Sequence, residues 1–197
     1  MKQEELDIIL ENHGKWLLNE GGERADLSNA DLKNTNLRFA NLRLADLRGA
    51  YLSYANFRGV DLRFADLSYA NLRFADLSYA NLRFADLSYA NLSNADLSNV
   101  NLSNANFRGV DLSDANLNWV NWQHVEGLTV ICVQVDTTCK NNQIAYIKEL
   151  DIWITGCFQG TLDELKASVE QTHKDNEKLR KRYYRVIDFI LNEVAEE

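Results

Sequence analysis

Leucine or phenylalanine recurs at every fifth position through the middle of the chain. The series begins at Leu27 and keeps its spacing to Leu117, after which Trp122 takes the next position. A small residue, usually alanine, stands two positions before each large one, and Asp or Asn usually lies between them. The unit is Ala-(Asp/Asn)-Leu-X-X, and the decapeptide Arg-Phe-Ala-Asp-Leu-Ser-Tyr-Ala-Asn-Leu occurs three times in tandem from Arg63.

A five-residue period matches neither an α-helix nor a long straight strand. It suits a chain that turns a corner every five residues and buries one large and one small side chain on each short side. Such units stack into a solenoid, because one unit alone cannot bury its apolar side. We expect a core ladder that includes Leu27, Leu47, Leu67, Leu87, Phe57, Leu77, Leu97 and Phe107. The residues just before and just after each leucine are expected to face solvent, because strand side chains alternate.

The repeated unit over residues 25–122 resembles the pentapeptide-repeat family, and the Glu-Arg-Ala-Asp-Leu segment after Gly21-Gly22 resembles bacterial and phage members. The resemblance implies a right-handed, four-sided β-solenoid with four pentapeptides per coil. Twenty units then give about five coils, or a rod about 24 Å long at ~4.8 Å per coil. We therefore expect a mainly β protein with an N-terminal capping helix in residues 1–23, the solenoid in residues 24–123 and a small C-terminal α/β cap in residues 124–197.

With four units per coil, residues twenty apart stack in columns, and the charges fall unevenly on the four faces. One face carries an acidic column, Asp26, Asp46, Asp66 and Asp86, and another carries a basic column, Arg43, Arg63 and Arg83. Both columns are candidate partner surfaces, and they meet along one corner. The alternative for the acidic column is structural, because Asp and Asn share this position and both hydrogen-bond neighbouring backbone at turns.

Aromatic side chains occupy the last position of many units, which places them at the corners of the coil. They are Phe39, Tyr54, Phe64, Tyr69, Phe74, Tyr79, Phe84 and Tyr89. Rings that lie one coil apart, such as Phe64 and Phe84, can stack and stabilise the solenoid. A partner-binding patch is the second interpretation, because exposed aromatic residues are common at interfaces.

The N-terminal segment predicts a helix over residues 3–20, because Leu6, Ile9, His13 and Trp16 follow helical spacing before Gly21-Gly22. Such a helix would cover the open edge of the first coil. We expect His13 to be a packing residue of this apolar stripe rather than a ligand.

The C-terminal segment predicts a small sheet and two helices. Strands are expected at Leu128–Val135, Gln143–Lys148 and Asp151–Thr155. A capping box at Thr161–Glu164 predicts one helix, and a second is expected from Asp175 to about Ala195. The second helix carries Tyr183, Tyr184, Phe189 and Ile190 close together. This apolar surface predicts a homodimer contact through the C-terminal region.

Composition narrows the function. The chain of 197 residues has 29 acidic and 21 basic residues, for a formal charge of −8, which predicts no direct nucleic-acid binding and no attraction to anionic membranes. No apolar run approaches the ~20 residues of a membrane helix, and the acidic start does not resemble a secretory signal. Three cysteines without paired spacing suit a reducing compartment, so we expect a cytoplasmic protein.

No catalytic, phosphate-binding or metalloprotease motif is found in the sequence. Cys132, Cys139 and Cys157 lack the Cys-x2–4-Cys spacing of zinc sites, so we expect buried free thiols, no metal and no cofactor. The sequence thus predicts a non-enzymatic protein-binding or scaffolding module with an unidentified protein partner.

The family resemblance raises one alternative, because some members mimic B-form DNA and regulate or protect DNA gyrase and other type II topoisomerases. Such mimicry needs a strongly negative surface. The repeat segment between Ala25 and Trp122 carries ten acidic and nine basic residues, so its charge does not favour this alternative.

Overall fold

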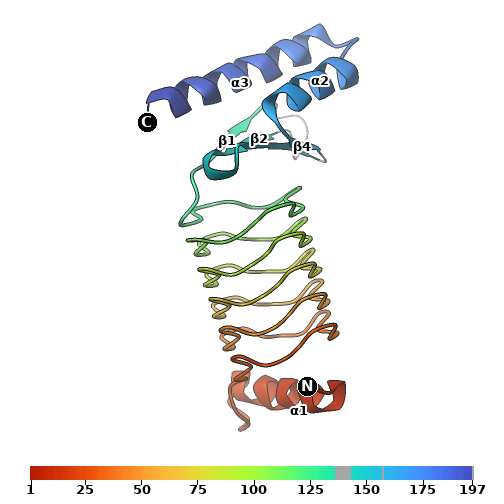
Figure 1. Ribbon diagram of the computed structural model, residues 1–197, viewed down its shortest axis with the longest axis vertical. Helices are drawn as coiled ribbons and strands as arrows, with labels where there is room; N and C mark the ends of the chain where they lie inside the picture. The colour runs from red at the N-terminus through yellow and green to blue at the C-terminus, as the bar shows by residue number, and fades with distance from the viewer. Residues whose placement is uncertain (136–142, 157, 197) are drawn as a thin grey trace. The chain divides into compact units, whose positions relative to one another are not determined.

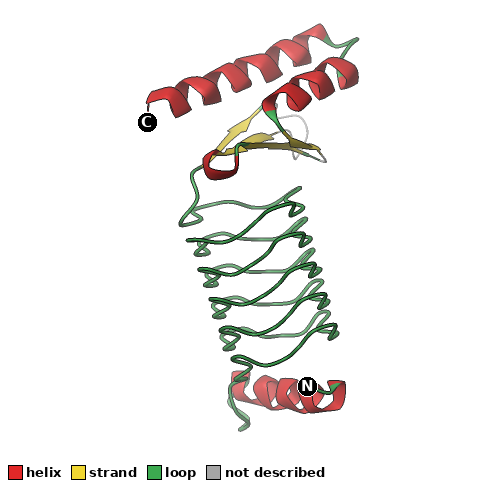
Figure 2. Cartoon of the chain, in the orientation of Figure 1, coloured by secondary structure: helices red, strands yellow, loops and turns green. Residues whose placement is uncertain are grey.

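The computed structural model describes residues 1–135, 143–156 and 158–196 (Figure 1). The contacts divide the chain into two units, Met1–Gly127 and Leu128–Glu197. The elements, in chain order, are α1 (Gln3–Leu17), β1 (Val130–Gln134), β2 (Gln143–Ile147), the 3-10 helix η1 (Lys148–Leu150), β3 (Ile152–Thr155), β4 (Phe158–Gly160), α2 (Leu162–Thr172) and α3 (Glu177–Glu196). Between α1 and β1 the chain runs as stacked turns and single bridges (Figure 2).

Parallel bridges join residues twenty positions apart, as in Asp46 with Asp66, so each coil contains four pentapeptides. Two hydrogen bonds illustrate the repeating pattern. Leu67 N donates to Asp86 O of the next coil at 2.7 Å, and Ala70 N donates to Leu67 O at 3.0 Å, which closes the turn within the unit. The solenoid expected from the five-residue period is therefore the fold of this segment.

The large and small repeat residues form the interior of the solenoid. The predicted ladder positions are each at most 1% exposed: Leu27, Leu47, Phe57, Leu67, Leu77, Leu87, Leu97 and Phe107. Full burial of such a side chain contributes about 1.5–3 kcal/mol to folding. The ladder thus stabilises the rod without a globular core.

The position after each leucine is not uniformly exposed, which corrects the expectation from strand alternation. Ser78 is 1% exposed, whereas Lys33 in the equivalent position is exposed. The serine is buried because its short side chain folds back along its own coil, where Ser78 Oγ donates to Asp76 Oδ1 at 2.5 Å. A long cation in this position cannot fold into the same space.

Helix α1 covers the open edge of the first coil, and its side chains replace the missing neighbouring strand. Gln3 Nε2 donates to Asn36 O at 3.2 Å, and Asn36 N donates to Gln3 Oε1 at 3.3 Å. This pair of bonds imitates the pairing that another coil would provide. Because unpaired strand edges invite association, α1 protects this end. The helix ends at Leu17, earlier than expected, and Asn19 adopts a left-handed conformation, with φ of 58°.

His13 is fully buried between α1 and the first coils, and both of its ring nitrogens bond to backbone. Ala25 N donates to Nδ1 at 3.0 Å, so the ring proton lies on Nε2, which donates to Arg43 O at 3.0 Å. Burial is the main cause that lowers the pKa of His13, and the charges of Arg24 and Arg43 act in the same direction, against the hydrogen bond to Arg43 O. His13 is therefore a packing residue whose surroundings favour the neutral ring.

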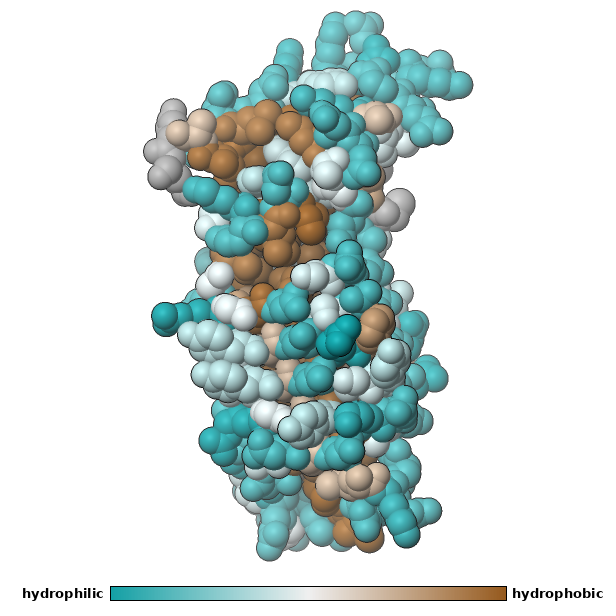
Figure 3. All heavy atoms as spheres, viewed as in Figure 1, coloured by the Kyte–Doolittle hydropathy of each residue, from teal (hydrophilic) through white to brown (hydrophobic). Residues whose placement is uncertain are grey.

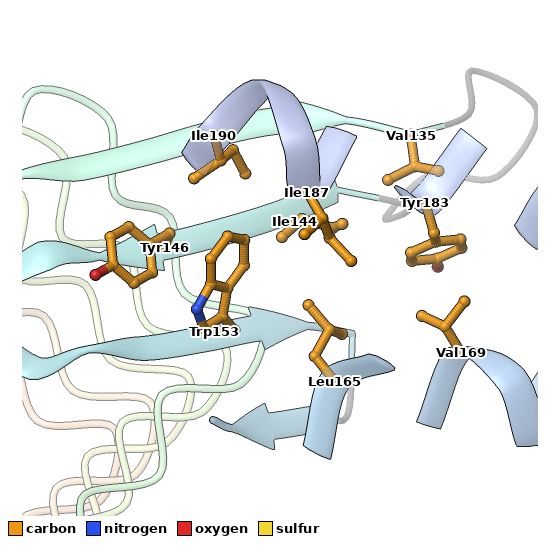
Figure 4. Packing of buried hydrophobic residues seen from close by; sticks show 9 residues of the cluster. All are labelled: Val135, Ile144, Tyr146, Trp153, Leu165, Val169, Tyr183, Ile187 and Ile190. Atoms are coloured by element: carbon orange, nitrogen blue, oxygen red, sulfur yellow. The ribbon is translucent and has the colours of Figure 1, made fainter. Parts of the chain in front are cut away.

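The second unit is a four-stranded antiparallel sheet in the order β1-β2-β3-β4, with α2 and α3 packed on it (Figure 4). Its core comprises Val135, Ile144, Tyr146, Trp153, Leu165, Val169, Tyr183, Ile187 and Ile190. Thr161 caps α2 through the expected capping box. The strands and helices lie close to the predicted ranges, and β4 is an additional short strand.

Cys132 is a free thiol in the middle of β1 and is exposed, contrary to the expected burial. The neighbouring Ile131 and Val133 pack against the helix-covered core, so the alternation of the strand turns Cys132 away from it. Cys139 and Cys157 lie outside the described residues.

The burial of neutral His13 predicts a pH dependence of stability. The ordinary pKa is 6.5 and the folded-state pKa is lower, so the unfolded chain binds more protons between these two values. Stability is then complete above about pH 6.5 and declines below it, by at most about 1.4 kcal/mol per pH unit. Urea unfolding at pH 7.5 and pH 5 measures this loss. The His13→Gln protein should lose less stability over the same interval, and an equal loss in both proteins would contradict the assignment.

Candidate functional site

Each corner of the coil holds one residue in the left-handed backbone region. From Asn29 to His124, every corner residue has φ between 55° and 69°. Glycine adopts this conformation freely, and Asn and Asp tolerate it. Many corners instead carry an aromatic residue, at a cost of about 1–2 kcal/mol each. In the sequence, Gly, Asn and Asp share the corner position with Phe and Tyr. This pattern indicates a left-handed residue at each corner, which the sequence-based expectations did not include.

The aromatic corner residues stack in columns, and their neighbouring rings are nearly parallel. Ring centroids lie 4.8 Å apart for Tyr54–Phe74, 4.8 Å for Phe64–Phe84 and 5.1 Å for Tyr69–Tyr89, with interplanar angles of 5°, 10° and 15°. These six residues nevertheless remain between 39% and 66% exposed. Stacking and an exposed surface, which were the two alternatives for these residues, therefore occur together. In the view of Figure 3, apolar residues lie at the surface among mostly hydrophilic ones.

Glycine interrupts the corner columns at three places. A Cβ added at Gly59 would lie 2.6 Å from two ring carbons of Phe39, and one added at Gly109 would lie 2.7 Å from a ring carbon of Tyr89. The aromatic ring of the preceding coil thus covers each of these glycines. Gly49 differs, because the neighbour of its added Cβ is the Asn29 amide oxygen, at 2.6 Å.

The acidic column Asp26, Asp46, Asp66 and Asp86 exists, since bridges link these residues in succession. Its carboxylates are engaged within the coil: Asp86 Oδ1, for example, accepts a bond from Ser88 N at 2.9 Å. The same bond, from an Asp or Asn side chain to the N–H two residues later, recurs along all four faces. The structural interpretation of this position therefore has direct support.

Asp46 requires a correction, because it is 5% exposed and cannot be part of an accessible acidic surface. Arg48 covers it, with Nε 2.8 Å from Oδ1 and Nη2 2.5 Å from Oδ2. Arg24 Nη2 approaches Asp46 Oδ2 at 3.8 Å. The hydrogen bond to Arg48 is the main cause that lowers the pKa of Asp46. The expectation that the whole column faces solvent was wrong at this residue.

The basic column is likewise uneven. Arg43 is half-buried, and its Nε has no hydrogen-bond partner among the described residues. Arg63 binds Asp61, with Nη2 2.6 Å from Oδ2. Arg83 is exposed, and its guanidinium carbon lies 4.7 Å from the centroid of the Phe84 ring. Only Arg83 of the three therefore presents an exposed guanidinium free of a carboxylate partner in the part of the chain that is described.

The Asp or Asn two positions before an arginine affects where that arginine lies. After an aspartate, the arginine folds back onto its own coil, as in Asp46–Arg48 and Asp61–Arg63. After Asn56 and Asn71, the arginine reaches the next coil, where Arg58 Nη1 donates to Ser78 Oγ at 3.1 Å and Arg73 Nε donates to Ser93 Oγ at 3.2 Å. Arg83, which follows Asn81, instead lies over the Phe84 ring of its own coil. A carboxylate accepts a charge-assisted, bidentate pair that an amide oxygen cannot match. The tripeptide Asp-Leu-Arg, found at Asp46–Arg48 and Asp61–Arg63, is the sequence signal for the ion pair within one coil.

Two searches concern other classes of site. Among the described residues, His, Cys, Asp and Glu form no group of three or more that could hold a metal ion. In the same part of the chain, no helix has the length and apolar character needed to cross a membrane.

The contact between Phe39 and Gly59 predicts energetic coupling. Gly59→Ala should destabilise the solenoid for two reasons, because φ there is +68° and the new methyl group displaces the Phe39 ring. In a Phe39→Ala background only the backbone cost of about 1 kcal/mol should remain. Urea unfolding of the four proteins in this cycle measures the coupling. An equal cost of Gly59→Ala in both backgrounds, within ~0.5 kcal/mol, would show that the ring does not cover the glycine.

Comparison with known proteins agrees with this architecture. A family model described as pentapeptide repeats, with eight copies, matches residues 25–63, 55–88, 65–104 and 90–121. No sequence among the curated proteins matches the chain.

Several solved structures are similar. A pentapeptide repeat protein from the Arabidopsis thaliana thylakoid lumen is 33% identical, with 50% of this chain and 69% of that chain covered and a TM-score of 0.50. Rfr23 from the cyanobacterium Cyanothece 51142 is 25% identical, with coverage of 59% and 97% and a TM-score of 0.32. QnrB1, a plasmid-mediated fluoroquinolone resistance protein, is 24% identical, with coverage of 55% and 54% and a TM-score of 0.41. The repeated units, the twenty-residue coils, the match to the family model and the 33% identity to the Arabidopsis thaliana protein show that the chain belongs to the pentapeptide-repeat family.

Proposed function

We propose that this protein is a non-enzymatic binding module that presents the corners of its solenoid to a protein partner. The observation that carries the proposal is the set of large apolar corner side chains, each between 37% and 69% exposed: Phe39, Leu44, Tyr54, Phe64, Tyr69, Phe74, Tyr79, Phe84, Tyr89 and Trp119. A solenoid needs inward-facing residues for its stability. Its corners accept Asn or Gly, so the aromatic residues there need a further explanation, which contact with a partner supplies.

The corner rings are suited to binding because they are ordered before a partner arrives. Each aromatic side chain projects from a backbone fixed by the coil, and three pairs of rings stack on each other. Binding loses less side-chain entropy when the contact residues are already fixed. Tyrosine and tryptophan are also enriched among the residues that contribute most to interface energies. These features support a protein partner rather than a small molecule.

The arrangement of charge does not support the DNA-mimic alternative. Asp46 is buried beneath Arg48, and Arg48 Nε also lies 3.8 Å from Asp66 Oδ2. The acidic column is therefore partly neutralised where mimicry would need exposed charge. An assay of gyrase supercoiling with added protein tests the alternative directly.

A second contact involves only the C-terminal unit. Phe189 and Leu191 on α3 are 49% and 38% exposed. We propose that this part of α3 forms a homodimer contact, and sedimentation velocity at high micromolar concentration measures the oligomeric state.

Asparagine substitutions at the corners test the proposed function without disturbing the coil. Asn94, Asn99 and Asn104 already occupy corners with φ near 60°, so Tyr69→Asn/Tyr89→Asn and Phe64→Asn/Phe84→Asn are conformationally matched. We expect proteins captured from the source lysate by the wild type to be lost from at least one column variant, while circular dichroism stays unchanged. The other two columns are tested by Tyr54→Asn/Phe74→Asn and Phe39→Asn/Tyr79→Asn. Equal capture by the variants of all four columns would contradict the proposal.

A further inference from the structure

Two corners of the solenoid have the same local sequence but different side-chain arrangements. Arg48-Gly49 and Arg58-Gly59 are the same dipeptide, and in each case Ser-Tyr follows one coil later, as Ser68-Tyr69 and Ser78-Tyr79. Each glycine leaves out one ring from its corner column, next to the face of a tyrosine. The two sites can therefore be compared directly, and only one of them is filled.

At Gly59, the Phe39 ring of the preceding coil covers the glycine, and the protein's own Arg58 lies over the face of Tyr79. The Arg58 guanidinium carbon lies 4.7 Å from the centroid of the Tyr79 ring, and Nη1 donates to Ser78 Oγ at 3.1 Å. Ser78 Oγ in turn donates to Asp76 Oδ1, so the serine oxygen is oriented to accept from the cation. Ser78 is only 1% exposed beneath this cover. The arrangement shows that the tyrosine and the serine of this type of corner can together bind a guanidinium group.

At Gly49, the equivalent space is an open pocket lined by Ser28, Asn29, Arg48, Gly49 and Tyr69. Arg48 lines this pocket, but its guanidinium is held on Asp46, with Nε 2.8 Å from Oδ1. Asn56 takes the place of this aspartate in the filled corner, and an amide does not hold the arginine in the same way.

The side chains around the open pocket correspond to those that contact the Arg58 guanidinium in the filled corner. Tyr69 is 66% exposed, and Tyr89, in the next coil away from Gly49, stacks on it at 5.1 Å. This leaves the other face of the Tyr69 ring toward Gly49. Ser68 is not one of the lining residues, but it precedes Tyr69 as Ser78 precedes Tyr79; it is 8% exposed, and its Oγ donates to Asp66 Oδ1 at 2.7 Å, as Ser78 does to Asp76. Its oxygen thus retains a lone pair for an incoming N–H.

We propose that the Gly49 pocket binds the guanidinium group of an arginine side chain of a protein partner, stacked on Tyr69 and donating to Ser68. The inference rests on the proposed function for the source of the arginine, but the pocket can be tested without a partner. Carboxylates of Asp26, Asp46 and Asp66 surround Arg48, with Arg24 as the other nearby cation, so the surroundings favour a further positive charge. Arginine fits better than lysine because its planar head stacks on a ring while its edge donates hydrogen bonds.

The experiment is an NMR titration of protein with labelled tyrosine rings, using N-acetylarginine methylamide as the probe. We expect a saturable shift of the Tyr69 ring, with a Kd on the order of 10 mM for so small a ligand, and no saturable shift of the Tyr79 ring. N-acetyllysine methylamide carries the same charge but lacks a planar guanidinium, and it should bind at least about tenfold more weakly. No response of Tyr69, or equal responses to both probes, would overturn the proposal.

Two reciprocal variants provide matched controls. Asp46→Asn should release Arg48 into the pocket and weaken the binding of the arginine probe at Tyr69 by at least about tenfold. Asn56→Asp should draw Arg58 onto its own coil and create a second responsive ring at Tyr79. The other tyrosine resonances report the fold of each variant in the same spectra. Undiminished binding by folded Asp46→Asn protein would overturn the proposal.

The proposed function and this inference can fail separately. If the arginine probe does not bind but the corner variants lose captured proteins, only the guanidinium site is wrong. If the probe binds Tyr69 while all column variants capture the same proteins as the wild type, the site exists but the corners are not the partner surface.

Discussion

The left-handed corner that recurs every five residues is the constraint on which the rest of the structure depends. It turns the chain so that leucine and alanine face inward, and it leaves one side chain per unit projecting outward. L-residues other than Gly, Asn and Asp resist this conformation. An aromatic corner recovers part of that cost by stacking on the corner residue of the next coil, as Phe64 does on Phe84. The same stacks form an ordered, exposed apolar surface. The residues that stabilise the coil are therefore also the residues proposed to bind a protein partner.

The Asp or Asn before each large core residue also affects the surface of the solenoid. Asp and Asn both accept the N–H two residues later, and either therefore maintains the turn. They differ in their effect on a following arginine, since only the carboxylate forms a bidentate ion pair with it, as in Asp46–Arg48 and Asp61–Arg63. The replacement of one oxygen by an amide nitrogen thus directs Arg48 and Arg58 in different directions and leaves one pocket open. Repeats that look almost identical in sequence consequently present different surfaces.

Much of the fold was predictable because the period reports burial directly. The ladder that includes Leu77 followed from the spacing alone, and the acidic and basic columns followed once the coil length was supplied by the family resemblance. The α1 segment was predictable from its apolar stripe, although Gln3 as a substitute strand was not, because that role depends on the backbone of Asn36 in the folded coil. The details of the candidate site were less predictable, because Asp46 and Ser78 are buried by side-chain hydrogen bonds within the coil and by arginines above or below it. The left-handed corners could have been inferred, because Asn99 and Gly109 occupy the same kind of position as Tyr79.

The crystal structure of the Asp46→Asn protein tests the central claim most directly, because it shows where Arg48 lies once its carboxylate partner is removed. The account predicts that Arg48 leaves its own coil, stacks on Tyr69 and donates to Ser68 Oγ, with a ring distance close to the 4.7 Å that separates Arg58 from Tyr79. An Arg48 side chain that keeps its present position, beside the substituted amide, would contradict the claim that the choice between Asp and Asn determines the surface of the solenoid.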